Sequence, residues 1–131
     1  MYEARLKDVP FFSSLDKKQL DIVAQQTDEV DIREGKDLVR QGELGHEFFI
    51  VESGTAEAKI DGQHVRDFGP GDFFGEIALL EEERRTATVT ATSPMTVIVM
   101  TRASFRALDR TVPEIHRIVH EAIVERRATT G

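Results

Sequence analysis

The chain has 131 residues, of which 40% are hydrophobic, so it can bury one hydrophobic core. A chain of this length is expected to form one domain. It contains no cysteine, which excludes disulfides and thiolate metal sites and leads us to expect a reducing, cytoplasmic location. Its 24 acidic and 17 basic residues give a formal charge of −7, which disfavours binding to nucleic acid, and no stretch approaches the roughly 20 apolar residues of a membrane helix.

The N-terminal segment, about residues 1–28, is predicted to be helical. Asp16 and Gln19 have the spacing of a capping box, so we expect the main helix to begin after Ser14. One face of that helix carries the residues expected to pack on the rest of the fold: Leu20, Val23, Ala24 and Thr27.

Residues 29–101 are predicted to form a β-barrel, because short alternating segments are separated by turns that contain glycine. The expected fold is mainly β with flanking helices, a jelly-roll barrel (double-stranded β-helix). The predicted strands are Val30–Arg33, Leu38–Gln41, Phe48–Glu52, Ala56–Ile60, His64–Phe68, Thr86–Ala91 and Met95–Met100. The run Glu81-Glu82-Glu83 is expected to be a solvated loop.

Residues 102–127 are predicted to form two C-terminal helices, Arg102–Asp109 and a longer one from Val112 to about Arg127. Thr111 and Glu114 are spaced as a capping box for the longer helix. That helix has one apolar stripe: Ile115, Ile118, Val119, Ala122 and Ile123. Packing against its own barrel could bury the whole stripe, so the sequence does not decide whether two copies of the chain form a dimer.

The motif that says most about function is Phe74-Gly75-Glu76-Ile77-Ala78-Leu79, which ends the first part of the barrel. It predicts a glycine followed by one helical turn, whose first N–H groups have no partner inside the helix. An anion there could accept bonds from the amides near Ile77 and Ala78, and Gly75 lets the main chain come close.

The second half of the motif is Arg85-Thr86-Ala87-Thr88-Val89. Alternation places Arg85 on the inward face of the predicted strand, where its guanidinium needs a counterion such as a phosphate. Glu76 suits a sugar hydroxyl, since its charge would repel phosphate. Taken alone, Arg85 could instead pair with Glu76 or another carboxylate, Glu76 could simply begin the helix, and Thr86 is an ordinary strand residue.

Together these two runs resemble the phosphate-binding cassette of cyclic nucleotide-binding domains. The resemblance extends to segments before and within the barrel and to the terminal helices, so it covers nearly the whole chain: Pro10–Leu15, Gln41–Gly45 and Val51–Gly54. It implies a regulatory binding domain, not an enzyme, with no catalytic residue, no metal and no cofactor other than the nucleotide ligand.

The resemblance also implies residue roles. Gly75, Ile77 and Ala78 would give backbone amides to the cyclic phosphate, Glu76 would bind the ribose 2′-hydroxyl, and Arg85 would pair with the phosphate. Thr86 would contact phosphate or purine, and its hydroxyl is compatible with either cAMP or cGMP. By analogy with stand-alone members we expect cAMP in preference to cGMP.

The long C-terminal helix resembles the lid helix of that family, which couples nucleotide binding to a protein effector. We therefore expect a sensor, free-standing or part of a larger protein, that acts through movement of this helix on an unknown effector. The helix is followed only by a few residues before Gly131, so no DNA-reading helix-turn-helix and no direct nucleic-acid contact are expected.

Two alternative functions, from other classes of protein, stay open. A cupin-like metal-binding barrel enzyme would need clustered histidines; His116 and His120 stand four apart without an evident third ligand, and His46 and His64 are expected to be isolated. A degenerate barrel that serves only as a protein-interaction module would be favoured by loss of Arg85 or Glu76, and both are present.

Overall fold

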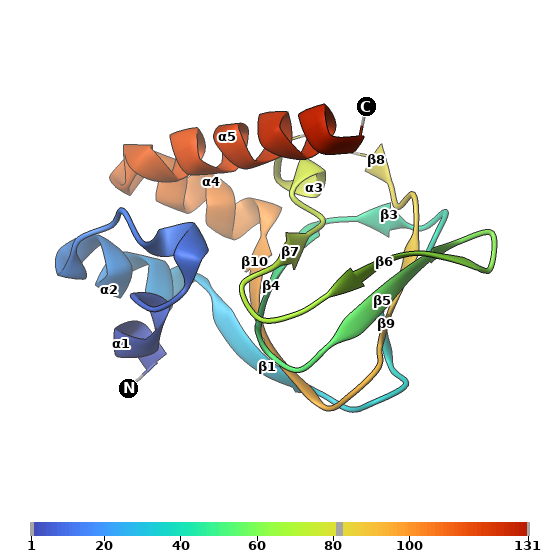
Figure 1. Ribbon diagram of the computed structural model, residues 1–131. Helices are drawn as coiled ribbons and strands as arrows, with labels where there is room; N and C mark the ends of the chain where they lie inside the picture. The colour runs from blue at the N-terminus through green and yellow to red at the C-terminus, as the bar shows by residue number, and fades with distance from the viewer. Residues whose placement is uncertain (1, 81–82, 131) are drawn as a thin grey trace.

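The computed structural model describes residues 2–80 and 83–130. Figure 1 shows a β-barrel with helices gathered along one side and one end. The helices are α1 (Tyr2–Leu6), the 3-10 helix η1 (Pro10–Phe12), α2 (Lys17–Gln26), α3 (Ile77–Leu80), α4 (Arg102–Thr111) and α5 (Pro113–Thr130). The strands are β1 (Asp28–Ile32), β2 (Asp37–Val39), β3 (Leu44–Gly45), β4 (Glu47–Ser53), β5 (Ala56–Ile60), β6 (Gln63–Phe68), β7 (Phe73–Phe74), β8 (Glu83–Arg84), β9 (Thr88–Ala91) and β10 (Met95–Thr101).

Two four-stranded antiparallel sheets form the barrel, with strand orders β1-β10-β4-β7 and β2-β9-β5-β6, and a short β3-β8 pair adds to them. This arrangement confirms the expected jelly-roll class with flanking helices. Ala56 and Ala58 of β5 face Ala91 and Val89 of β9 in the register, so small side chains line the interior of the second sheet.

Strands β4 and β10 form the wall between the barrel and the helices, and both are buried on their two faces. Phe48 and Ile50 of β4 belong to the cluster on the helical side, whereas Phe49 and Val51 belong to the cluster inside the barrel. A strand that is covered on both faces reads as a continuous apolar run, and the sequence of β4 does so.

The helical side is packed around side chains from all the longer helices. The capping box is confirmed, since the Gln19 N–H donates to Asp16 Oδ1 at 2.8 Å and the Asp16 N–H donates to Gln19 Oε1 at 2.9 Å. The predicted stripe of α5 is used within this chain, where Ile115, Val119 and Ile123 join the same cluster as Leu20 and Val23 of α2.

The predicted capping box at Thr111 is wrong. Thr111 is the last residue of α4, and its hydroxyl donates to the Ala107 carbonyl oxygen at 3.3 Å. Because the Val112 N–H still bonds to the Leu108 carbonyl oxygen, at 2.7 Å, and α5 starts at Pro113, a single residue separates the two helices. No room is left for a separate cap.

Other differences are local. The predicted N-terminal helical segment is divided into α1, η1 and α2, and the two-residue strands β3, β7 and β8 were not predicted. Strand β9 begins at Thr88, so Arg85 and Thr86 lie in the connection that precedes it. Of the run expected as a solvated loop, Glu81 and Glu82 fall outside the described residues, and Glu83 begins β8.

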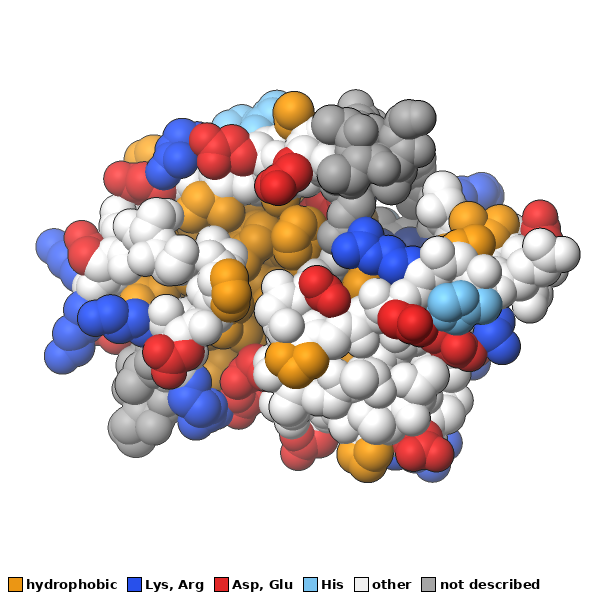
Figure 2. Space-filling model, in the orientation of Figure 1, with side chains coloured by type: hydrophobic (Ala, Val, Ile, Leu, Met, Phe, Trp, Pro, Cys, Tyr) orange, Lys and Arg blue, Asp and Glu red, His pale blue; other side chains and the backbone are white. Residues whose placement is uncertain are grey.

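Across the described residues, no helix combines the length and apolar character needed to cross a membrane. Hydrophobic side chains are visible in the hollow between the N-terminal helices and the barrel, while charged side chains lie mostly around it (Figure 2). Two half-buried aromatic rings pack against the helical-side cluster, where Phe11 lies against Phe73 with ring centroids 5.2 Å apart.

Candidate functional site

A pocket of about 490 Å³ opens where the second sheet meets α3 and the connection before β9. All six residues predicted for the site line it: Gly75, Glu76, Ile77, Ala78, Arg85 and Thr86. The structure thus brings together two sequence segments, residues 75–78 with the first half of α3 and residues 85–86 directly after β8.

Gly75 is fixed in the pocket wall by two constraints. Its φ of +83° lies in the left-handed region, and a Cβ at this position would come within 2.7 Å of Arg85 Nη1 and 2.8 Å of the Glu47 carbonyl oxygen. Only glycine satisfies both, so Gly75 lets Arg85 and the Glu47 carbonyl group pack closely against the main chain.

Arg85 lies half-buried at the pocket, and its position is defined by several contacts. Its Nη2 donates to the Glu47 carbonyl oxygen at 2.7 Å. Its backbone is tied to the β2–β3 connection, since the Arg85 N–H donates to the Glu43 carbonyl oxygen and the Gly42 N–H donates to the Arg85 carbonyl oxygen, both at 2.8 Å. Burial lowers the pKa of Arg85, and the charges of Glu47 and Glu76 oppose that shift.

Gly45 makes room for the guanidinium. A Cβ at position 45 would overlap the Nε, Cζ and Nη2 atoms of Arg85, although this glycine has no positive φ. It is therefore required by the contact with Arg85 and not by a turn. Gly45 was noted in the sequence only as the end of the segment Gln41–Gly45 that carries the resemblance, and no local signal marks its contact with Arg85.

Glu76 is the buried carboxylate of the pocket, with 4% of its surface exposed. Thr86 is exposed at the rim, Ile77 is half-buried and Ala78 is buried. The expectation that the Ala78 amide lacks a partner is wrong, because a turn before α3 lets it donate to the Gly75 carbonyl oxygen at 3.1 Å. A ligand oxygen would compete with that carbonyl for the same proton.

The sequence analysis missed most of the apolar wall. It is formed by inward-facing residues of β2, β5, β6, β7 and β9, namely Val39, Ala58, Phe68, Phe74 and Val89. The alternation of β5 could have identified Ala58 in the same way that the alternation after Arg85 places Val89 inward. Arg66 also lines the pocket, with its guanidinium 4.8 Å from the centre of the Phe68 ring.

The pocket has no donor set for a cupin-type metal, since none of its lining residues, within the part of the chain that is described, is a histidine. His116 and His120 lie on α5 with ring centroids 4.6 Å apart, and His116 Nδ1 is 3.2 Å from Asp109 Oδ1. That group is outside the pocket. What the pocket offers is an apolar chamber with a cation, a buried carboxylate and a glycine at one end.

Residues 29–111 match the profile of the family described as the cyclic nucleotide-binding domain. The chain is also similar to the cAMP-dependent protein kinase regulatory subunits of Emericella nidulans, at 36% identity over 119 residues, and of Schizosaccharomyces pombe, at 37% over 109 residues. These alignments cover 89% and 82% of this chain but only 29% and 26% of the relatives, so the chain spans less than a third of their length.

Solved structures show the same similarity. The regulatory domain of Toxoplasma gondii PKA, crystallised with cAMP, aligns with a TM-score of 0.80 at 33% identity, over 100% of this chain and 49% of that one. The catabolite activator protein of Thermus thermophilus aligns with a TM-score of 0.83 at 26% identity, over 92% of this chain and 59% of that one.

Proposed function

This chain belongs to the cyclic nucleotide-binding domain family, and from that premise we propose that it is a sensor that binds cAMP in preference to cGMP in the pocket at Gly75 and Arg85. The observation that carries the proposal is a half-buried guanidinium held beside an apolar chamber of about 490 Å³. A cyclic phosphate satisfies the planar fork of an arginine, and a purine fills an apolar chamber.

The proposed roles follow from chemistry and position. Arg85 pairs with the cyclic phosphate, and the amides of Gly75, Ile77 and Ala78 donate to its oxygens. Glu76, a buried acceptor, binds the ribose 2′-hydroxyl. Thr86 at the rim offers a hydroxyl to phosphate or purine. The preference for cAMP is supported by relatives whose names specify cAMP and by similar domains crystallised with it.

We propose that the readout is a movement of α5 and not a chemical reaction. No described residue of α5 lines the pocket, so the helix would have to shift in order to meet the bound base. A physical link exists, because Arg102 at the start of α4 donates Nε to the Ala78 carbonyl oxygen at 2.8 Å, and only Val112 separates α4 from α5. The ligand can shift α5 only by its differential affinity for the two positions.

A protein effector would read this movement, and a cytoplasmic location is part of the same proposal. The printed names of the relatives describe regulatory subunits of a kinase, and a regulatory role without catalysis agrees with that description. The whole relatives are more than three times as long as the matched region, so their names alone do not identify the partner of this chain.

The test is calorimetric titration of the chain with cAMP and cGMP in parallel, together with thermal unfolding. At a hundredfold excess over Kd, cAMP should stabilise the fold by about 2.7 kcal/mol. Arg85→Ala should weaken binding by about a hundredfold or more, since a buried charge pair is lost. Arg40→Ala is the matched control, because it removes the same charge from an exposed residue outside the pocket.

Three outcomes would contradict the proposal. If neither nucleotide changes the Tm of the parent chain, the barrel serves as a protein-interaction module. If Arg85→Ala binds cAMP as tightly as the parent, the phosphate assignment is wrong. If cGMP binds more tightly than cAMP, the proposed preference is reversed and the site assignment stands.

A further inference from the structure

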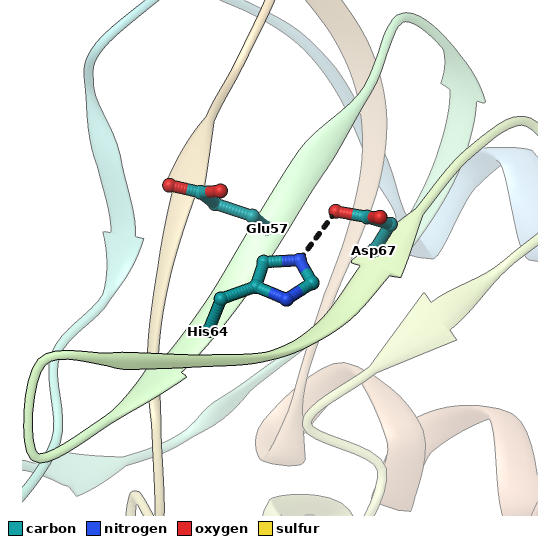
Figure 3. Close-up of side chains that lie close together, drawn as sticks. All are labelled: Glu57, His64 and Asp67. Atoms are coloured by element: carbon teal, nitrogen blue, oxygen red, sulfur yellow. Dashed lines mark hydrogen bonds and ion pairs between the residues drawn. The ribbon is translucent and has the colours of Figure 1, made fainter.

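A second group of chemically active side chains lies outside the pocket, on the β5–β6 hairpin. Figure 3 shows Glu57, His64 and Asp67 close together, with His64 Nε2 bonded to Asp67 Oδ1 at 2.7 Å. One ligand atom from each residue lies within 4.8 Å of those of the other two. Among the described residues, this is the one group of three or more histidine, aspartate or glutamate side chains with that geometry.

A β-bulge creates the group. Glu57 pairs with Asp67 and Ala58 with Arg66, but Lys59 then pairs with His64, so the register shifts and Val65 has no partner on β5. In a regular strand, residues 64 and 67 would point to opposite faces of the sheet. The extra residue in β6 turns His64 to the same face as Asp67. The sequence analysis treated His64 as isolated because it could not detect this shift.

This group places two carboxylates side by side. Glu57 and Asp67 are direct cross-strand partners, and like charges in that arrangement repel each other. Lys59 partly offsets this, with Nζ 3.3 Å from Glu57 Oε1, and His64 bonds to Asp67. One imidazole and two carboxylates are a donor set that suits zinc and related first-row metals better than magnesium or calcium.

We propose that Glu57, His64 and Asp67 form a binding site for a divalent transition metal, with Zn²⁺ as the representative ion. His64 would bind through Nε2 and the two acidic residues through carboxylate oxygens, while Lys59 would leave Glu57. His64 and Asp67 are 49% and 79% exposed, so water can occupy the remaining positions. The ion would join β5 to β6 across the hairpin.

This site does not depend on nucleotide binding. Ala58, Arg66 and Phe68 of the same hairpin line the pocket, whereas Glu57 and Asp67 alternate with them and point to the outer face. Failure of the metal site would therefore leave the proposed cyclic nucleotide site untouched, and the reverse also holds.

The experiment is calorimetric titration of the untagged, chelator-treated chain with Zn²⁺, and with Mg²⁺ in a parallel run. We expect one equivalent of Zn²⁺ to bind and no comparable signal from Mg²⁺. His64→Ala should weaken zinc binding by about tenfold or more. Lys59→Ala should tighten it by roughly threefold to fivefold, because a competing charge is removed. The double change His116→Ala with His120→Ala is the control and should leave the affinity unchanged.

The proposal is overturned if millimolar Zn²⁺ gives no saturable binding, or if His64→Ala binds it like the parent. It is also overturned if the His116 and His120 double variant alone loses binding, since the metal would then sit on α5. His64 is an exposed side chain, and circular dichroism of each variant verifies that the fold is retained.

Discussion

The two sides of the wall formed by β4 and β10 are built for different purposes. On the helical side, Phe48 and Ile50 enter a cluster in which most side chains are fully buried. On the barrel side, Phe49 and Val51 enter a smaller cluster that ends at an open pocket. Strand β4 therefore contributes to stability with one face and supports the binding pocket with the other.

This difference between the two sides predicts that substitutions on each side affect different properties, either stability or ligand affinity. Changes on the helical side should lower the free energy of unfolding and spare the affinity of the pocket for ligand. Changes at the charged end of the pocket should do the opposite.

Phe12→Ala should cost about 3–5 kcal/mol of unfolding free energy, because the fully buried ring contributes to the helical-side cluster and would leave a cavity. Urea unfolding measures the loss. The folded fraction should still bind cAMP with the Kd of the parent. A large rise in Kd at a temperature where the variant is folded would show that the helical side also shapes the pocket.

Gly45→Ala should weaken cAMP binding by about 2 kcal/mol and change stability by less than about 1 kcal/mol, since the new methyl group must displace the Arg85 guanidinium. Titration calorimetry and urea unfolding measure the two effects. Gly69→Ala is the matched control, because a Cβ there meets no atom within 4 Å and its φ is not positive. Equal affinity of the two variants would contradict the role given to Gly45.

Glu52→Gln tests the N-terminal contact of the barrel with α1. Burial raises the pKa of Glu52 from 4.5 to about 7, with Glu29 adding to the shift and Arg5, whose Nε is 3.7 Å away, opposing it. The folded state thus favours the protonated form, and this contribution to stability is present below pH 4.5 and lost as pH rises through 7.

Glutamine mimics the protonated carboxyl group. The variant should therefore be more stable than the parent at pH 8 by about 1 kcal/mol, a value reduced for solvent screening, and equal to it near pH 4. Urea unfolding at the two pH values gives the difference. Equal stability at pH 8, or a change in cAMP affinity, would show that the carboxyl group has another role.

Most features set by local sequence were predicted well, although the cap at Thr111 was not. The Asp16 and Gln19 cap and the apolar stripe of α5 depend on residues a few positions apart, and both are confirmed. The longer strands were found to within a few residues for the same reason. The six predicted site residues line one pocket, but their individual roles remain predictions.

Features set by distant contacts were not predictable. The strands β3, β7 and β8 have two residues each and exist only through pairing with remote segments. The shift that brings His64 to Asp67, and the overlap of Arg85 with Gly45, depend on how strands align in three dimensions. A β-bulge is defined by the pairing of two strands, so the pattern of one strand alone does not reveal it.

The bond from Arg85 to the Glu47 carbonyl oxygen has a consequence for how tightly a ligand can be held. An arginine side chain that is already held by a hydrogen bond loses little rotational freedom when it binds an anion, and that loss would otherwise cost about 0.5–1.5 kcal/mol. The side-chain entropy of Arg85 is thus lost during folding, and its loss does not weaken the binding of the anion.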